Sequence, residues 1–331
     1  MKAIQIEEYG DLGKLQFVDV PEPPFGDGEV LVKIAYAGVN FIDIYMRDGV
    51  FRKLETYPNS PPFTPGMEGA GIVEAIGPGV MEFEKGDSVS YCLEVGSYAE
   101  FAVVPAWKLV KVPVDIPLDI ATALQLQGMT AHYLTHSLFP LTKDHTCLIH
   151  AGAGGMGQLA IQLAKIRGAQ VIVTVGSQEK AEIAKARGAD HCILYREVDF
   201  SEAVLDLTNG KGADVIYDSV GKETIKGSLR CLKSLGVLSN NGYASGAIGS
   251  LDPLDLAEAG SVFFTRPHLA SYIPTSEVRA KRSYDLYKLY IDGNLTVNID
   301  RTLPLSQVAL AHKAIEERQS KGKILLVSDE N

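Results

Sequence analysis

Few of the residues that mark secreted, membrane-spanning or metal-centred proteins occur in this sequence. Only four of its 331 residues are cysteine, and they are widely separated with no C-x-x-C pair: Cys92, Cys147, Cys192 and Cys231. This spacing argues against a zinc knuckle or a disulfide framework as the basis of the fold. No apolar run approaches the roughly 18 residues of a membrane span, and the chain starts with a strand-like alternation rather than a signal peptide. We therefore expect a cytoplasmic protein with no membrane partner.

Basic residues are also in deficit. Lysine and arginine number 31 against 41 aspartates and glutamates, which gives a formal net charge of −10. A chain with this balance repels polyphosphate surfaces, so nucleic acid is not expected as a partner. Hydrophobic residues make up 46% and charged residues 22% of the chain, which is typical of a globular protein. Its length predicts about two domains.

The pattern of expected elements changes near residue 119. Residues 1–113 contain short alternating strands between turns rich in glycine and proline, which predicts a barrel-like β domain. The proline-rich residues 57–65 predict a surface loop in this region. From residue 119 onward helices and strands alternate, which predicts a parallel sheet with helices on both faces.

The last part of the chain returns to the first style. From residue 294 the pattern is again strand-like, so this tail is expected to rejoin the β domain. The sequence thus predicts an α/β protein in which a doubly wound Rossmann sheet is inserted into a β-barrel-type catalytic domain. The expected boundaries are 1–122 and 294–331 for the catalytic domain and 123–293 for the Rossmann domain.

A glycine-rich turn follows the first strand of the second domain. Gly152, Gly154 and Gly157 satisfy the pattern G-x-G-x-x-G. Such glycines let the backbone approach a pyrophosphate, while the next helix presents unpaired N–H groups. The pattern alone also fits an ordinary structural turn. The strand before it, the helix after it and at least four further strands favour dinucleotide binding.

The end of the second strand carries no carboxylate. An acidic residue there would bind the ribose 2′-OH of NAD, but this sequence has Gly176 and Ser177. Ser177 can donate to a 2′-phosphate, Lys180 supplies positive charge, and Tyr195 ends the third strand. These residues favour NADPH. In the alternative interpretation, Ser177 only caps a helix and Lys180 is a solvated surface lysine.

Six short segments spread over nearly the whole chain carry more specific patterns: residues 38–43, 66–71, 86–89, 150–157, 217–221 and 265–267. Together they resemble the zinc-independent quinone oxidoreductases of the medium-chain dehydrogenase/reductase superfamily, the zeta-crystallin type. The resemblance implies a GroES-like catalytic domain, a Rossmann domain and NADPH. It also implies a homodimer built across an edge strand of the sheet.

Two positions distinguish this sequence from the zinc-dependent relatives in that superfamily. Those relatives have a cysteine at the position of Asn40 and a histidine at the position of Met67. Asparagine and methionine are poor zinc ligands, so no metal is expected. His132 and His136 are spaced i, i+4, but they lack both the intervening glutamate of a zinc motif and a third ligand. Two histidines on a helix surface are the favoured interpretation.

Without a Lewis acid, alcohol oxidation is the less favoured reaction. A quinone or a C=C bond conjugated to a carbonyl accepts hydride with charge delocalised onto oxygen, so hydrogen-bond donors near that oxygen suffice. The sequence offers the Asn40 amide, the Tyr45 hydroxyl and Thr130 as catalytic donors. Tyr45 fits equally well as a helix residue packed on Phe41. Asp43 is expected to orient the local loop.

The resemblance also implies a set of cofactor contacts: Asn40, Thr130, Gly154, Gly155, Met156, Ser177, Lys180, Tyr195, Ser219, Gly242, Tyr243, Phe264 and Arg266. The loop 240–246 departs from the family pattern, because Asn241 and Tyr243 stand where phenylalanine and asparagine are expected. This departure lies in the region where the acceptor is expected to bind.

These observations predict an NADPH-dependent reductase that transfers hydride to a small-molecule quinone or a related α,β-unsaturated carbonyl compound without a metal. An enal or enoyl-thioester reductase on the same fold is one alternative. A nucleotide-binding, crystallin-like protein with little turnover is another.

Overall fold

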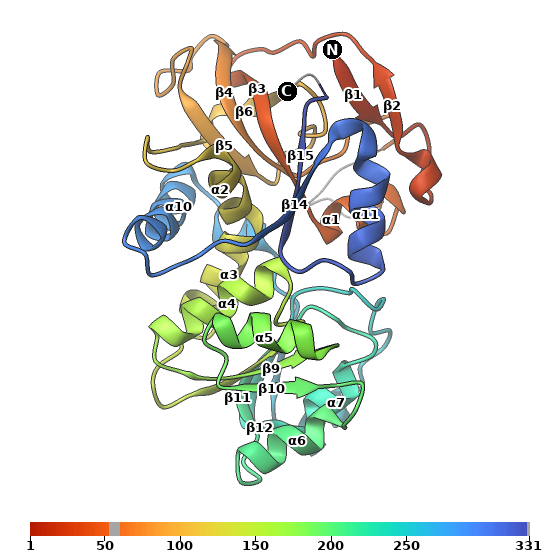
Figure 1. Cartoon of the computed structure of the whole chain (residues 1–331), viewed down its shortest axis with the longest axis vertical. Coiled ribbons are helices and arrows are strands. Elements are labelled where there is room, and N and C mark those ends of the chain that lie inside the picture. The colour runs from red at the N-terminus through yellow and green to blue at the C-terminus, as the bar shows by residue number, and fades with distance from the viewer. Residues whose placement is uncertain (53–59, 330–331) are drawn as a thin grey trace. The chain divides into compact units, whose positions relative to one another are not determined.

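The computed structural model describes residues 1–52 and 60–329, which form two compact units (Figure 1). The first unit comprises Met1–Met129, Tyr272–Gly293 and Val297–Asn331, and the second comprises Thr130–Ser271 and Asn294–Thr296. Of the expected surface loop, residues 57–59 lie outside the described residues. No helix among the described residues has both the length and the apolar character that crossing a membrane requires.

The first unit is built on a seven-stranded sheet with the order β14-β15-β3-β4-β5-β7, in which β6 also pairs with β3. Two further strands form a separate antiparallel pair. The strands of this unit are β1 (Lys2–Gln5), β2 (Gln16–Asp19), β3 (Glu29–Val39), β4 (Glu68–Ile76), β5 (Ser88–Cys92), β6 (Phe101–Pro105), β7 (Val110–Lys111), β14 (Ile299–Pro304) and β15 (Lys323–Val327).

Alternating side chains place the core of this sheet on one face. In β3, Val30, Val32 and Ile34 belong to the core of the sheet and Lys33 is exposed on the other face, where Leu31 is also buried. At the end of the chain β15 pairs antiparallel with β3, so the tail lies in this sheet as its pattern predicts (Figure 1). The main helices are α1 (Phe41–Arg47), α2 (Leu118–Ala123), α10 (Ser276–Ile291) and α11 (Val308–Glu316), and η3 (Leu124–Gly128) is a π-helical turn.

Helix α10 belongs to the first unit, whereas the sequence placed residues 272–293 in the Rossmann domain. Its buried side chains explain the difference. The hydroxyl of Tyr287 lies 2.7 Å from the hydroxyl of Ser90 and accepts a hydrogen bond from Gln125 at 2.8 Å. Arg279 donates to the carbonyl oxygen of Cys92 at 2.9 Å. Helix α10 follows the alternating strands and helices of the Rossmann domain in the sequence, but its buried side chains contact the sheet of the first unit.

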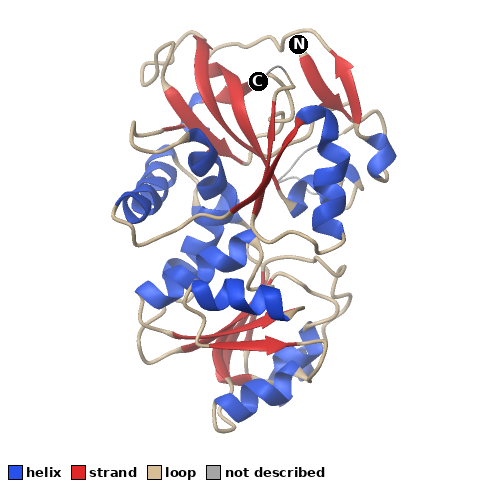
Figure 2. Ribbon diagram, in the orientation of Figure 1, coloured by secondary structure: helices blue, strands red, loops and turns tan. Residues whose placement is uncertain are grey.

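The second unit is a six-stranded parallel sheet with helices around it (Figure 2). Its strand order is β10-β9-β8-β11-β12-β13, which is the doubly wound Rossmann order. The strands are β8 (Thr146–His150), β9 (Gln170–Val175), β10 (His191–Leu194), β11 (Ala213–Asp218), β12 (Leu232–Asn240) and β13 (Phe263–Thr265). The helices are α3 (Met129–Tyr133), α4 (Gly155–Ile166), α5 (Gln178–Ala186), α6 (Phe200–Leu207), α7 (Ile225–Arg230), α8 (Pro253–Glu258) and α9 (Leu269–Tyr272).

The middle strands of this sheet are buried on both faces. Cys147, Leu148 and Ile149 of β8 are fully buried, which is why the sequence shows an unbroken apolar run there. The strand order reverses between β8 and β11, its two central neighbours. In open α/β sheets, ligands bind outside the carboxyl ends of the strands at such a switch point. The predicted fold class is therefore confirmed, and it identifies one edge of this sheet as the place to look for a site.

The close approach of β3 and β4 generates a stability prediction. A Cβ on Gly71 would overlap the carbonyl oxygen of Lys33, a main-chain atom that cannot move without disturbing the pairing of the two strands. We expect Gly71→Ala to lower the free energy of unfolding by about 2 kcal/mol or more. Gly26→Ala is the control, since no atom lies within 3.8 Å of its added Cβ. Urea unfolding should separate the two variants, and equal stability would contradict this account.

Candidate active site

The glycine-rich turn lies at the switch point, directly after β8. A Cβ on Gly152 would lie 2.7 Å from the Cβ of Val173 on β9, and one on Gly157 would overlap the carbonyl oxygen of Ala151. Gly154 is the N-cap of α4, with an extended backbone and its nearest crowding atom at 3.3 Å. The first N–H groups of α4 have no intrahelical acceptor. Two glycines thus serve close packing, and the third leaves a helix N-terminus accessible to an anion, as in dinucleotide-binding turns.

The turn that follows β11 packs against the loop that follows β12. Asp218 fixes the first of these by accepting from the N–H groups of Val220 and Gly221 at 2.8 and 2.9 Å. A Cβ on Gly242 would lie 2.6 Å from the carbonyl oxygen of Ser219. Ser219 and Gly242, two residues of the predicted cofactor set, therefore lie side by side on the carboxyl edge of the sheet.

A third group of predicted residues gathers at the ends of β9 and β10. Ser177 is the N-cap of α5, and its hydroxyl oxygen accepts from the N–H of Lys180 at 3.4 Å. A Cβ on Gly176 would lie 3.0 Å from the hydroxyl oxygen of Tyr195, so that hydroxyl lies close to the turn. Ser177 therefore caps the helix through its hydroxyl oxygen, and its hydroxyl proton can still be donated to a ligand. No carboxylate interrupts β9 or the two residues after it.

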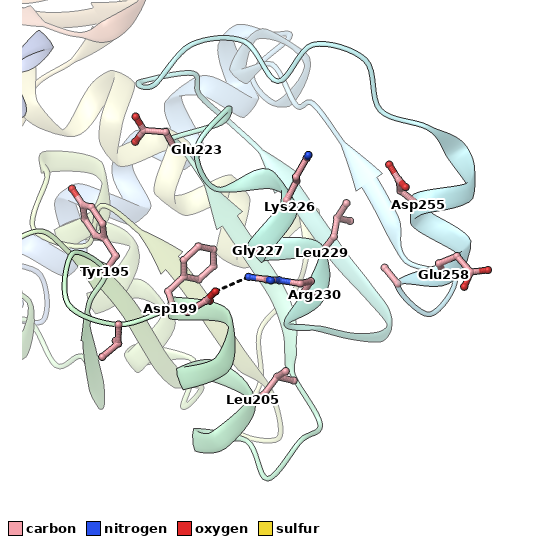
Figure 3. A pocket seen from close by; sticks show the side chains of 13 residues that line it. Tyr195, Asp199, Leu205, Glu223, Lys226, Gly227, Leu229, Arg230, Asp255 and Glu258 are labelled. Atoms are coloured by element: carbon pink, nitrogen blue, oxygen red, sulfur yellow. Dashed lines mark hydrogen bonds and ion pairs between the residues drawn. The ribbon is translucent and has the colours of Figure 1, made fainter.

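A groove of about 1210 Å³ lies beside this corner, along α6, α7 and α8 (Figure 3). Tyr195 is at its rim, and Asp199 and Arg230 form an ion pair of 2.8 Å within it. Hydrogen bonds from Ser201 lower the pKa of Asp199 to about 2. The glycine-rich turn does not line the groove, so this hollow is distinct from the expected pyrophosphate position.

Asn40, in the first unit, is buried, and both protons of its side-chain amide are donated to other groups of the protein. Its Nδ2 group donates to the carbonyl oxygen of Gly38 at 3.1 Å and to Glu68 at 2.8 Å. Its Oδ1 accepts from Lys323 at 2.8 Å and from Gln127 at 3.2 Å. Since an amide has two protons, both are used within the protein. This geometry disagrees with the expectation that Asn40 donates to the acceptor oxygen.

A buried ion pair lies behind Asn40. The Lys323 ammonium and the Glu68 carboxylate are at most 1% exposed and are in direct contact. The other carboxylate oxygen of Glu68 accepts from the N–H of Leu126 in the π-helical turn η3 at 2.6 Å. The pair thus joins β15, β4, η3 and the start of α1. Sequence reasoning missed it, although a lysine in the apolar run K-I-L-L-V was a visible signal.

Asp43 orients the loop before α1, as expected. It accepts from the N–H of Asn40 at 2.8 Å, the N–H of Met67 at 3.0 Å and the hydroxyl of Tyr98 at 2.9 Å. Burial raises the pKa of Asp43 to about 7, against the hydrogen bonds from Asn40 and Tyr98, which favour the ionised form. The carboxylate therefore spans the two positions, Asn40 and Met67, at which zinc-dependent relatives are expected to have ligands.

A directed hydrogen-bond chain continues from Asp43. Nη1 of Arg47 lies 3.3 Å from Nδ1 of His312, and Nε2 of His312 lies 3.3 Å from the hydroxyl of Tyr98. Because arginine only donates, Nδ1 accepts, and His312 carries its proton on Nε2 toward Tyr98. Burial and the charge of Arg47 lower the pKa of His312 to about 3. The histidine is therefore neutral in the folded protein near pH 7.

The two remaining donor candidates are partly buried. The ring of Tyr45 stacks on Phe41 with centroids 5.9 Å apart and tilts against Phe51 at 5.3 Å. The packing interpretation of Tyr45 is therefore correct for its ring, and it leaves the role of the hydroxyl open. Thr130, in α3, is partly exposed.

The histidine pair is stacked rather than splayed. The rings of His132 and His136 are 4.2 Å apart and nearly parallel, and Nδ1 of His136 pairs with the hydroxyl of Thr135 at 2.8 Å. His132 is only 9% exposed, which differs from the expected position on the helix surface. Within residues 1–52 and 60–329, no group of three or more His, Cys, Asp or Glu side chains is placed to hold a metal ion.

The His312 chain generates a pH prediction. The unfolded chain takes up a proton at this histidine below about pH 6.5, but the folded protein does not until about pH 3. The associated stability is therefore fully present above pH 6.5 and is lost as the pH falls toward 3. We expect His312→Gln to cost about 1–2 kcal/mol at pH 7.5 and to flatten the loss of stability between pH 7 and 4.5. Urea unfolding across this range tests it, and parallel curves for both proteins would refute the assignment.

Comparison with known proteins places these features in a family. Residues 26–114 match the alcohol dehydrogenase GroES-like domain, and residues 155–272 match the domain family described as zinc-binding dehydrogenase. The chain is 41% identical over 309 residues to a 2-haloacrylate reductase of Burkholderia sp, covering 91% of each protein. It is 38% identical to the quinone oxidoreductase of Pseudomonas aeruginosa, covering 98% of this chain and 99% of that one. The crystal structure of Escherichia coli quinone oxidoreductase complexed with NADPH matches with a TM-score of 0.95 at 35% identity, over 99% of this chain and 100% of that one. The chain therefore belongs to the quinone oxidoreductase family of the medium-chain dehydrogenase/reductase superfamily.

Proposed function

We propose that the protein is an NADPH-dependent reductase that transfers hydride to quinones or other α,β-unsaturated carbonyl compounds without a metal ion. One observation carries the proposal: the glycine-rich turn lies at the switch point of a Rossmann sheet whose second strand ends without a carboxylate. The family supports it, because relatives are named quinone oxidoreductase and 2-haloacrylate reductase, and the E. coli structure holds NADPH. When bound, NADPH supplies the hydride.

The residues around the sheet edge fit this cofactor. Gly154, Gly155 and Met156 would bind the pyrophosphate through the open N-terminus of α4. Ser177, Lys180 and Tyr195 would hold the 2′-phosphate at the ends of β9 and β10. The remaining contacts would come from Ser219, Gly242, Tyr243, Phe264, the main chain of Arg266, Thr130 and Asn40.

We assign the donor role to the hydroxyls of Tyr45 and Thr130, and a positioning role to Asn40. Both protons of the Asn40 amide are used by Gly38 and Glu68. The Asn40 main chain starts α1, and Tyr45 is on that helix. The amide therefore fixes the helix that carries Tyr45 and leaves polarisation of the acceptor oxygen to the hydroxyl.

The edge of the Rossmann sheet supports a homodimer. Strand β13 ends the sheet and pairs with β12, and Phe263 on it is 61% exposed. An edge strand with an exposed aromatic residue is a template for a second strand, here that of a second copy. The four cysteines are all free, as is usual in a reducing compartment, which supports a cytoplasmic location.

The first functional test is acceptor-dependent oxidation of NADPH. We expect the purified protein to consume NADPH with simple quinones or enones, and to keep its rate after dialysis against a chelator, because its proposed donors are hydroxyls. Absorbance at the nicotinamide band measures the reaction. A protein that binds NADPH but reduces no member of a panel of quinones, enones and enals would be a nucleotide-binding protein with little turnover instead.

The second test concerns the choice of cofactor. If Lys180 pairs with the 2′-phosphate, Lys180→Ala should weaken NADPH about 10- to 100-fold, the contribution of one charged hydrogen bond, and leave NADH within about three-fold. Lys185→Ala is the matched control, since this lysine is on the same helix and pairs with Glu182 at 3.0 Å. Fluorescence titration gives both dissociation constants. Equal weakening of the two nucleotides by Lys180→Ala would indicate damage to the fold.

A further inference from the structure

Arg266 is a half-buried arginine at the carboxyl end of β13 that has no counter-ion within the described part of the chain. Its guanidinium carbon lies 4.4 Å from the ring centroid of Tyr243, and its Nη1 donates to the carbonyl oxygen of Pro267 at 3.2 Å. Its Nε is buried and has no hydrogen-bond partner among residues 1–52 and 60–329. The ring of Tyr243 and the carbonyl of Pro267 thus fix one face and one end of the guanidinium, while Nε, on the edge that it shares with Nη2, has no partner among the described residues.

That edge is the part of arginine that binds a carboxylate through two parallel hydrogen bonds. Leaving a buried N–H unsatisfied costs free energy, so such a group is expected to have a ligand. The positive charge also acts on its surroundings, because burial and the charge of Arg266 together lower the pKa of His268. The geometry and the charge both point to an anion.

The position of Arg266 in the sheet argues against a phosphate of the cofactor. In the order β10-β9-β8-β11-β12-β13, β13 is three strands from β8 and five from β10. At about 4.8 Å between strands, Arg266 is roughly 14 Å from the strand that precedes the pyrophosphate turn and roughly 24 Å from the strand that ends at Tyr195. An anion bound by Arg266 would therefore not be one of these phosphates, and the acceptor is the other ligand of the proposed reaction.

We propose that Arg266 binds a carboxylate on the acceptor, so that α,β-unsaturated carboxylic acids are preferred substrates. This rests on the proposed function and specifies its substrate class. Hydride adds to the β-carbon of the C=C bond, the electron pair moves to the α-carbon and the carboxylate, and the α-carbon takes a proton from solvent, while NADPH becomes NADP⁺. Negative charge builds up on the acid during this step, and the fixed guanidinium stabilises it.

The neighbouring loop is adapted to such a substrate. Tyr243 lies against one face of the guanidinium, and Asn241 in the same loop has a buried Oδ1 that finds no hydrogen-bond partner in the described part of the chain. Both residues stand where the family pattern has others, phenylalanine for Asn241 and asparagine for Tyr243. Two departures from the family pattern therefore occur after β12, beside the adjacent strand β13, which is followed by an arginine of the segment 265–267 that fits the pattern.

The experiment compares acceptors that share one C=C bond. Wild type, Arg266→Gln and Arg266→Lys are assayed with 2-chloroacrylate, with its uncharged methyl ester and with 1,4-benzoquinone, and NADPH binding is titrated by fluorescence. Arg230→Gln is the matched control, because Arg230 is in the groove and pairs with Asp199. Inhibition of quinone reduction by 2-chloropropionate, a saturated acid, reports carboxylate binding without turnover of the acid.

We expect the wild type to prefer the acid over its ester. Arg266→Gln should lower kcat/KM for the acid about 30-fold or more, the loss expected for a charged bidentate contact, and abolish inhibition by 2-chloropropionate. The ratio of kcat/KM for the acid to that for the ester should therefore fall about 30-fold, whereas the affinity for NADPH, which only the main chain of Arg266 is proposed to contact, should stay within about three-fold. Arg266→Lys should recover part of the loss, because it keeps the charge but not the two-pronged geometry.

Three outcomes would overturn the proposal. An equal loss for all acceptors indicates a structural role for Arg266, and weaker NADPH binding by Arg266→Gln indicates a cofactor phosphate instead. If the wild type reduces quinones but no unsaturated acid, this proposal is wrong and the proposed function stands. Failure of the wild type with every acceptor sinks the proposed function itself.

Discussion

The contact between the Lys323 ammonium and the Glu68 carboxylate fixes how the last strand, β15, lies against β4 in the first unit. Both groups are almost completely buried, so neither can recover its hydration if the other is removed. Such a pair contributes little net stability, but removing one partner costs about 3–5 kcal/mol, because the remaining charge is left without compensation. This asymmetry makes the arrangement specific, since any packing that separates the last strand, β15, from β4 carries that cost.

The same pair determines what Asn40 can do. The ammonium donates to the oxygen of its amide and the carboxylate accepts from the nitrogen, so the oxygen must face Lys323 and the nitrogen must face Glu68. An amide clamped in this way cannot rotate to meet a substrate. Gln127 donates a further hydrogen bond to the same amide oxygen and adds to this restraint. A layer whose polar groups are paired with one another therefore lies beneath α1, the helix that carries Tyr45, the proposed donor.

The parts of this architecture that follow from local rules could be predicted from the sequence. The glycine-rich turn, the apolar run of β8 and the missing carboxylate after β9 depend on residues within about 30 positions of each other, and they identified the Rossmann sheet and its ligand edge. The role of Asn40 could not be predicted, because its partner Lys323 is 283 residues away and meets it only through strand pairing. Helix α10 was assigned to the wrong unit for a similar reason. Its sequence shows a helix, whereas the buried contacts of Tyr287 and Arg279 decide which sheet it covers. The boundary between the units also falls inside a continuous helical run, where no turn marks it.

The chemistry of the acceptor follows from where positive charge is fixed. A reductase whose sequence has asparagine and methionine at the metal-ligand positions must stabilise the charge that hydride brings by other means. Hydroxyl donors suffice for a quinone, because its two oxygens share the charge. They do not suffice for an unsaturated acid, which already carries one negative charge and resists a second. A guanidinium held in place by Tyr243 and Pro267 stabilises the second negative charge, and it does not have to move during the reaction to do so. The loop that differs from the family pattern is the one that holds this guanidinium, so the departure of the loop and the proposed preference for an acidic acceptor share one physical cause.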